Sequence, residues 1–285
     1  MNKITQIFVC LLLLAAYGAA TRLQAEPLPN LTLAREANWL IIRGPHLPQG
    51  EVRINYLEAY CRAGSTDRDW KETVVGHKTE LLNSSPDGKT LSLRCTVNDG
   101  LVVTHVITAG ADEVTFDLTV VNPTDHLNEA QWAQPCVRLG DFAGPQQQDP
   151  RCVDLKFERC FIFLDGKLAR LPTTPWAITA RYVPGQVWCP KHVPRSDVNP
   201  RPLSVLVPSS GLIGCFSADD QWVFAMAFEP YQELFQGVAR CLHSDFRIGV
   251  LAPGMTKKIH GKIYLMKNDI PALVARYTRE FLDGH

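Results

Sequence analysis

Apolar and polar residues alternate along most of this chain, and the pattern predicts strands. Between Glu51 and Leu139, apolar residues return at every second position in short runs, which is the period of a half-buried β-strand. Turn-forming sequences rich in Pro, Asp, Asn and Gly separate the runs. We therefore expect hairpins of an antiparallel sheet, with strands at 52–56, 91–95, 101–103, 114–120 and 131–139.

The second half of the chain begins less regularly. The segment 140–208 contains more Pro and Gln and one clear strand at 160–164, so we expect long ordered loops over a sheet. A short C-terminal helix should follow, with Asp269 as its N-cap and Pro271 in its first turn. The predicted fold class is all-β, with antiparallel sheets, long ordered loops and this helix. Between the loop-rich segment and this helix, alternation returns and predicts strands at 212–216, 222–228, 238–248 and 256–266.

The first 25 residues have the features of a signal peptide. Lys3 precedes an apolar stretch from Ile7 to Ala16, and small residues follow as far as Ala25. This stretch is shorter than the roughly 20 residues that a membrane-spanning helix requires, and no later stretch is uniformly apolar over that length. We expect cleavage near Ala25, one domain over 26–285, and a secreted or periplasmic protein without a membrane span.

Charge and cysteine content narrow the possible partners and the chemistry. The chain has 29 basic and 29 acidic residues, so it offers no field that would collect nucleic acid, and no nucleic-acid partner is expected. Of its 9 cysteines, Cys10 lies in the predicted leader. The others predict disulfides in an oxidising compartment, with buried free thiols as the alternative.

The strongest candidate for a site is the strand 238–248 together with the acidic sequence before it. Period two places four polar side chains on one face of this strand and an apolar set on the other. Glu229 and Glu233 lie in the preceding segment, which we expect to be a loop because Pro230 interrupts it. The polar face consists of Cys241, His243, Asp245 and Arg247, and the apolar face of Val238, Leu242, Phe246 and Ile248.

These residue types suit acid/base work on a sugar polymer. Glu229 and Glu233 could divide into acid and base for glycoside cleavage. His243 could exchange protons, with Asp245 setting its tautomer and Arg247 holding an acidic group of the substrate. The alternative is structural: solvated carboxylates in a loop, and a polar cross-strand ladder on an outer face.

Further polar and aromatic residues could complete a sugar-binding surface. Aromatic rings stack on the apolar face of a sugar, while amides and arginines serve its hydroxyl groups. Each of these residues is also common as an ordinary half-buried sheet residue, so the prediction depends on their clustering. The predicted binding residues are Tyr231 and Gln232; Trp132, Gln134 and Arg138 on one strand; Glu58, Tyr60 and Arg62 on another; and Trp188 and His192 in the loop-rich segment.

No cofactor is predicted, and no residue is assigned as a metal ligand. The sequence contains no Gly-x-Ser-x-Gly, His-Glu-x-x-His, P-loop or Gly-x-Gly-x-x-Gly motif. Cys189 and His192, with Cys241 and His243, could supply two sulfur and two nitrogen ligands for a structural zinc. Export disfavours that alternative because it favours disulfides.

Several sequence features resemble galactose-mutarotase-like β-supersandwich domains. They are Gly100–Ile107, a turn, Val114–Pro123, and a strand that starts near Trp132, with the closing segment Pro253–Lys258 and the Asp269 helix. The whole chain also looks like a group of secreted bacterial proteins of unknown function. The resemblance implies a two-sheet supersandwich with a concave sugar-binding sheet. The His-rich signature of true mutarotases is absent, so epimerase activity is not implied.

The sequence therefore predicts an exported carbohydrate-binding protein. In its catalytic version, the protein processes a polysaccharide by acid/base hydrolysis or β-elimination on the concave face of a sheet. Two alternatives stay open: a non-catalytic carbohydrate-binding module, and a structural or partner-binding envelope protein.

Overall fold

The computed structural model describes six segments of the chain. They are residues 30–45, 47–144, 158–171, 185–199, 202–237 and 241–283. The predicted signal peptide and Cys152 lie outside these residues.

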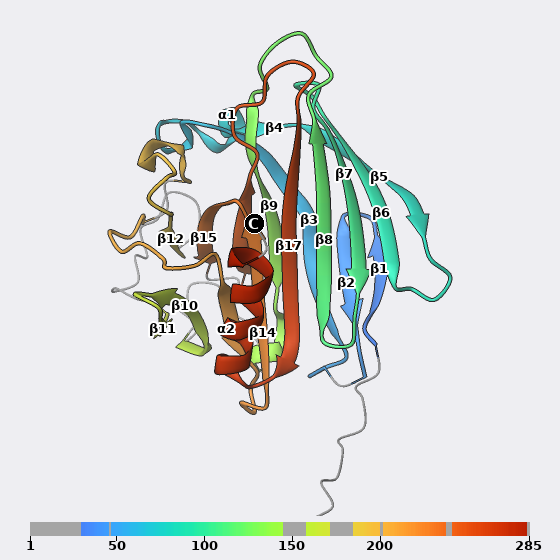
Figure 1. Cartoon of the computed structure of the whole chain (residues 1–285), viewed down its shortest axis with the longest axis vertical. Helices are drawn as coiled ribbons and strands as arrows, with labels where there is room; N and C mark the ends of the chain where they lie inside the picture. Colours follow the sequence, from blue (N-terminus) through green and yellow to red (C-terminus); the bar gives the residue numbers. More distant parts are fainter. Residues whose placement is uncertain are drawn as a thin grey trace, which may run out of the picture.

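The described residues form two antiparallel sheets that pack face to face (Figure 1). In sheet A the strand order is β1-β2-β3-β9-β16-β15-β12, with β4 paired to β3. In sheet B it is β11-β10-β13-β14-β17-β8-β7-β6-β5. The strands of sheet A are β1 (Thr32–Glu36), β2 (Trp39–Arg43), β3 (Glu51–Arg62), β4 (Val74–Val75), β9 (Ala130–Arg138), β12 (Gly185–Trp188), β15 (Tyr231–Gly237) and β16 (Cys241–Arg247). Those of sheet B are β5 (His77–Ser84), β6 (Thr90–Val97), β7 (Val102–Ala109), β8 (Glu113–Val121), β10 (Cys160–Leu164), β11 (Lys167–Arg170), β13 (Ile213–Phe216), β14 (Trp222–Glu229) and β17 (Thr256–Lys267).

Alternation along the strands determines which side chains lie between the sheets. On β8, the four apolar residues Val114, Phe116, Leu118 and Val120 are buried in the shared core, and the residues between them face outward. The same pattern holds on β6. This confirms the all-β class and the two antiparallel sheets predicted from the sequence.

A row of aromatic rings joins the two sheets at the centre of the core. Tyr56 on β3 contacts Phe116 on β8, Phe116 contacts Phe228 on β14, and Phe228 contacts Phe246 on β16, each pair with ring centroids 5.5 Å apart. The ring of Phe228 lies directly against the backbone of Gly261 on β17. The row therefore runs from sheet A into sheet B and back again.

The chain changes sheets at Pro230, and this corrects the expected acidic loop. Glu229 ends β14 in sheet B, whereas Tyr231 begins β15 in sheet A. Proline has no backbone N–H, so it cannot continue the hydrogen bonds of β14. The residues after it pair with β16 as a regular strand apart from one irregularity between Tyr231 and Glu233.

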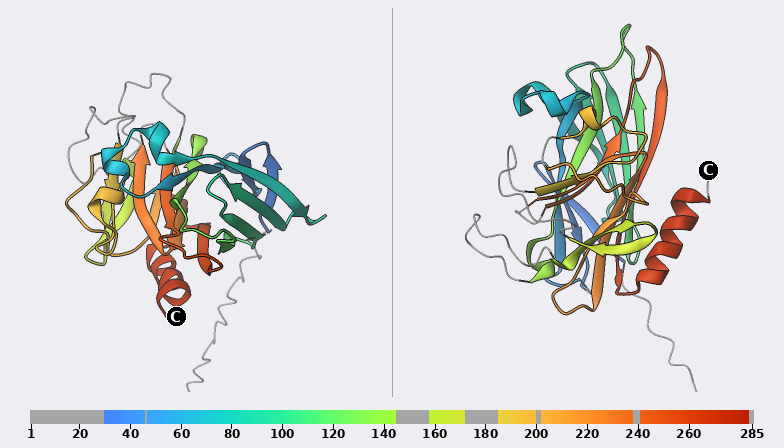
Figure 2. Two further views of the ribbon diagram at one scale, coloured as in Figure 1. Left: turned by 90° about the horizontal axis from the view of Figure 1, so that it is seen from above. Right: turned by 90° about the vertical axis from the view of Figure 1, so that its left-hand side faces the viewer.

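The C-terminal helix α2 (Ile270–Tyr277) covers the face of sheet B that points away from sheet A (Figure 2). The Asp269 side chain accepts a hydrogen bond of 2.9 Å from the Ala272 amide, which confirms the predicted N-cap. A turn of π-helix (Thr278–Leu282) continues it. The short helix α1 (Trp70–Thr73) and 3-10 turns at Ser65–Asp67, Gly140–Ala143 and Arg195–Asp197 complete the described helices.

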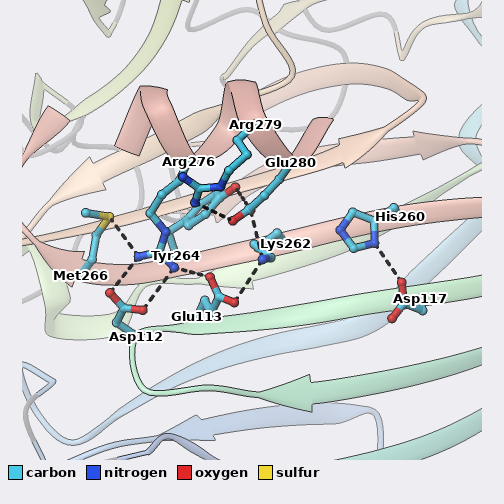
Figure 3. Close-up of polar contacts among 10 residues, drawn as sticks. All are labelled: Asp112, Glu113, Asp117, His260, Lys262, Tyr264, Met266, Arg276, Arg279 and Glu280. Carbon is cyan, nitrogen blue, oxygen red and sulfur yellow. Dashed lines mark hydrogen bonds and ion pairs between the residues drawn. The ribbon is translucent and has the colours of Figure 1, made fainter. Parts of the chain in front are cut away.

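A charged network also ties the C-terminal helix to sheet B (Figure 3). Arg276 pairs with Asp112 at 2.8 Å and with Glu113, and Lys262 bridges Glu113 (3.1 Å) and Glu280 (3.0 Å). The Tyr264 hydroxyl donates to Glu280 at 2.7 Å. These groups are mostly shielded from solvent and satisfy one another, so we regard the network as structural.

The described residues also bear on the predicted disulfides and on membrane-spanning helices. Six described cysteines are buried free thiols, so the predicted disulfides are not present among them: Cys61, Cys95, Cys136, Cys189, Cys215 and Cys241. No helix in the described segments combines the length and apolar character needed to span a membrane.

We expect Gly261→Ala to destabilise the protein by about 1–3 kcal/mol, because the added methyl group would overlap the Phe228 ring. Urea denaturation should show a smaller loss when the same substitution is made in a Phe228→Leu background. Equal losses in the two backgrounds would contradict this explanation.

We also expect His105 to make the fold sensitive to acid. His105 is fully buried and its Nδ1 lies 2.8 Å from the Tyr56 hydroxyl, and burial lowers its pKa to about 3. Because the unfolded state binds a proton near pH 6.5 and the folded state does not, stability should fall as the pH drops from 6.5 towards 3. The slope from this residue approaches about 1.4 kcal/mol per pH unit.

Urea denaturation at several pH values would measure this slope. It should be shallower in His105→Gln than in the wild type. Parallel slopes for the wild type and His105→Gln would rule out this role.

Candidate functional site

The outer face of sheet A, which points away from sheet B, carries a group of polar side chains at its centre. Gln134 on β9, His243 and Asp245 on β16, and Glu233 on β15 lie on adjacent strands, and we call them the buried polar row. Glu233 lies directly opposite Asp245 in the strand register. All four residues are at most 1% exposed.

Hydrogen bonds and charge contacts connect the row. The Gln134 amide donates to Asp245 Oδ2 at 3.3 Å and lies 3.4 Å from His243 Nδ1. His243 Nδ1 is 3.3 Å from Asp245 Oδ1. Glu233 Oε2 accepts a hydrogen bond of 3.0 Å from the Asn199 amide in the covering loop. The row is therefore held from both the strands and the loop.

Burial and mutual charge shift the pKa values of this row. Burial alone would lower the pKa of His243, but the Asp245 carboxylate and the Cys241 thiol outweigh it and raise the pKa to about 10. Burial raises the pKa of the Asp245 carboxyl, and His243 offsets part of that shift. Both shifts favour a proton shared by this pair.

Two loop segments cover the outer face. Val193 and Val198, in the loop at 193–199, pack with Cys136, Phe235 and Cys241. These contacts cover the end of the row at His243, because Phe235 lies opposite His243. Trp70 and Val74 pack on Trp132 and Cys61. Figure 2 shows the segment that carries α1 on the opposite side of the molecule from α2. The sequence prediction of long loops over a sheet is thus confirmed for the described part of the chain.

Asp197 fastens these two loops to sheet A. Its carboxylate accepts a hydrogen bond of 3.0 Å from the Gly64 amide and lies 3.4 Å from Arg247 Nη2. Its carbonyl accepts hydrogen bonds from the Ser65 hydroxyl and, at 3.1 Å, from the Gln232 amide. The sequence offered only an ordinary Asp in a Pro-rich loop, so its position could not be predicted.

A second polar group lies where β16 ends, and we call it the rim cluster: Arg247, Gln232, Tyr231, His192 and Lys257. Arg247 Nη1 donates to Gln232 Oε1 at 2.5 Å. The rings of His192 and Tyr231 meet edge to face with centroids 6.4 Å apart. Burial, then the charges of Arg247 and Lys257, lower the pKa of His192. Arg247 and Lys257 supply the positive charges of the cluster, and the carboxylates of Asp197 and Glu229 lie close to them. His192 is exposed to solvent.

A surface pocket of about 310 Å³ lies beside the rim cluster. Its lining consists of Arg62, Ala63, Arg68, Glu129 and Gln131. Gln131 connects the two features, because its carbonyl accepts a hydrogen bond of 2.8 Å from the Ile248 amide, the residue after Arg247.

Arg62 and Arg68 play different parts in this pocket. Arg62 is engaged by Glu129 at 2.6 Å and by the Glu72 carbonyl at 2.9 Å. Arg68 comes from the 65–70 loop, and no local pattern distinguishes it from the other charged loop residues. It is nevertheless the half-buried basic group that the loop brings to the pocket.

The structure does not place the other predicted residues in one cleft. Glu229 ends β14 opposite His260 in sheet B, so it does not share a face with Glu233. Trp132 lies on the outer face but is completely buried, and its Nε1 donates to the Arg62 carbonyl at 3.1 Å. Trp188 is buried in the core between the sheets.

Strand β3 also departs from simple alternation. Its pairing with β9 is irregular between Asn55 and Ala59 and again near Arg62. Tyr60 consequently points into the core, where its hydroxyl lies 3.5 Å from His105, whereas Glu58 lies 3.8 Å from Arg138 on the outer side. The expected shared face of Glu58, Tyr60 and Arg62 is wrong because these irregularities change the direction of the side chains.

Comparison with known proteins gives similarity of fold at low sequence identity. No family model matches the chain, and no curated protein matches it. Similar solved structures include the Slr1438 protein from Synechocystis sp. PCC 6803, with 10% identity, a TM-score of 0.46, and coverage of 85% of this chain and 96% of that one.

Two further solved structures carry names from the superfamily that the sequence resembles. One is a putative aldose 1-epimerase from Escherichia coli K12, with 12% identity, a TM-score of 0.44, and coverage of 83% of this chain and 99% of that one. The other is a galactose mutarotase-like protein from Lactobacillus casei ATCC 334, with 7% identity, a TM-score of 0.43, and coverage of 83% and 100%. At these values, nothing about activity is taken from them.

We expect Asp197→Ala to loosen both covering loops, because the Gly64 amide and Arg247 lose a charged partner. The loss of stability should be about 1.5–3 kcal/mol. Hydrogen exchange followed by mass spectrometry should show faster exchange at 64–67 and 193–199. Asp67→Ala, an exposed aspartate of the same loop, should leave exchange unchanged. Similar exchange in both variants would contradict the fastening role.

Proposed function

We propose that this chain is a carbohydrate-binding protein, and that its binding surface is the arginine-lined pocket together with the rim cluster. The observation that carries the proposal is the lining of the pocket: Arg62 and Arg68 beside Glu129 and Gln131. The export predicted from the first 25 residues would bring such a surface to extracellular or periplasmic glycans.

The lining has the chemistry that an acidic sugar requires. The Arg68 guanidinium can bind a carboxylate through paired, charge-assisted hydrogen bonds, while Arg62, which Glu129 and the Glu72 carbonyl already hold, contributes charge. The Gln131 side chain offers a donor and an acceptor to sugar hydroxyls. The volume is at the lower end of the range for small-molecule pockets, which suits one or two sugar units. Arg247 and Lys257 of the rim cluster extend the positive charge from the pocket.

Binding is a better supported proposal than catalysis. Glu233 is 0% and His243 1% exposed, so a polymer could reach them only if the covering loops moved. Glu229 lies in the other sheet and does not oppose Glu233 across a cleft. Acid/base processing by these three residues stays a prediction from the sequence.

Isothermal titration with two oligosaccharides of equal length, one of uronic acid units and one neutral, would test the proposal. The uronate should bind more tightly, and binding should weaken with added salt because the attraction is electrostatic. Arg68→Gln should weaken uronate binding about 10-fold, the loss of one charged hydrogen bond. Arg94→Gln, an exposed arginine on β6, is the matched control and should have no effect.

Other results would overturn the proposal. Equal binding of both sugars, or equal effects of Arg68→Gln and Arg94→Gln, would exclude an acidic-sugar site in the pocket. Release of shorter sugars that is lost in Glu229→Gln, Glu233→Gln or His243→Ala would show processing instead of simple binding. Failure to bind any glycan would favour a structural envelope protein.

A further inference from the structure

Three side chains that can bind a metal ion meet on the outer face of sheet A, at the His243 end of the buried polar row. Cys136 lies on β9, and Cys241 and His243 lie two residues apart on the neighbouring strand β16. Their ligand atoms all lie within 4.8 Å of one another, and all three residues are buried. No other such group of three occurs in the segments that the structure describes.

The sheet geometry explains why these side chains converge. Residues two apart on one strand project from the same face, and a neighbouring strand lies about 4.8 Å away. In the register of β16 with β9, Cys241 lies opposite Arg138 and Leu242 opposite Val137. Continuing this register places Cys136 opposite His243, so the three side chains form a triangle on the outer face.

The histidine is oriented as a metal ligand would be. His243 Nδ1 faces the Asp245 carboxylate at 3.3 Å, and Nε2 is buried without a hydrogen-bond partner in the described structure. In metal sites, the nitrogen that does not bind the metal usually faces a carboxylate, which is the role that Asp245 could serve here.

The charges of the two cysteines also suit a divalent cation. Two thiolates and a neutral imidazole would cancel the charge of a divalent ion, so the ion and its three ligands together would carry no net charge.

We infer that Cys136, Cys241 and His243 form a zinc-binding site, with Asp245 as the residue that orients His243. In a tetrahedral zinc site with bonds of about 2.0–2.3 Å, ligand atoms are about 3.5–3.8 Å apart. Because the ligand atoms lie within 4.8 Å of one another, each pair needs to approach by roughly 1.0–1.3 Å at most, a shift that side-chain rotation supplies. Three protein ligands leave one position for a further small ligand.

This site differs from the zinc alternative considered from the sequence. Cys189 belongs to the same apolar cluster but not to the ligand triangle, and His192 lies in the exposed rim cluster. Cys136, which is distant in the sequence but lies on the neighbouring strand β9, completes the triangle with Cys241 and His243. The inference stands on different atoms from the proposed sugar site and does not depend on it.

Metal titration of the reduced, folded full chain would test the site. Zn²⁺ should bind in a 1:1 ratio and raise the melting temperature, and Co²⁺ should give a thiolate-to-metal charge-transfer band and the visible bands of tetrahedral cobalt. Bound zinc should protect Cys136 and Cys241 from alkylation, as located by peptide mass spectrometry. This measurement uses only the wild-type chain, so it does not depend on whether variants fold.

Variants then separate ligands from neighbouring residues. Cys136→Ser, Cys241→Ser and His243→Gln should each abolish the cobalt charge-transfer spectrum or alter it. Asp245→Asn should keep the spectrum and weaken zinc binding about 10- to 100-fold, as expected for a group that only orients a ligand. Cys61→Ser, a fully buried thiol on the same side of sheet A, is the matched control and should bind zinc like the wild type.

Three outcomes would overturn the inference. The first is zinc binding that leaves Cys136 and Cys241 as reactive as they are without metal. The second is loss of binding in Cys61→Ser equal to that in Cys136→Ser. The third is a disulfide between Cys136 and Cys241 in the protein isolated without reductant.

Discussion

The two faces of strand β16 must satisfy two different environments, and most of the structure depends on this constraint. Leu242 and Phe246 point into the core between the sheets, where Phe246 ends the aromatic row. His243 and Asp245 point the other way and are equally buried, because loops cover the outer face. One strand therefore carries both the apolar contact between the sheets and a desolvated group of polar side chains.

Burying polar groups on the outer face has a cost that the covering segments offset. Each buried charge or amide requires a partner, and here the partners come from adjacent strands and from the loops. Asn199 binds Glu233, while Asp197 holds Gly64, Gln232 and Arg247. The loops are thus part of the electrostatic environment of the sheet, and they also decide what a ligand can reach.

The outer face divides into two regions with different chemistry. Towards the end of β16, Arg62 and Arg68 line a surface pocket beside the rim cluster, and this is the surface that we propose for an acidic sugar. Deeper on the same strands, two thiols and an imidazole lie together in an apolar setting, which suits a soft metal ion. Trp132, Gln134 and Asp245 lie between the two regions along β9 and β16, so each region could act without the other.

Sequence periodicity missed β1, β2 and β5, but with the capping pattern it was sufficient for the class of fold, for β3, β6, β7, β8 and β9, and for the Asp269 cap. These features depend on side-chain alternation and on local hydrogen bonds, which neighbouring residues determine. Periodicity also placed Cys241, His243, Asp245 and Arg247 correctly on one face of their strand. Three further features were decided by tertiary structure: the strand after Pro230, the inward direction of Tyr60, and the joining of Cys136 to His243. Each depends on which distant strands pair, on where their register slips, and on which loops exclude water, and a local pattern does not carry that information.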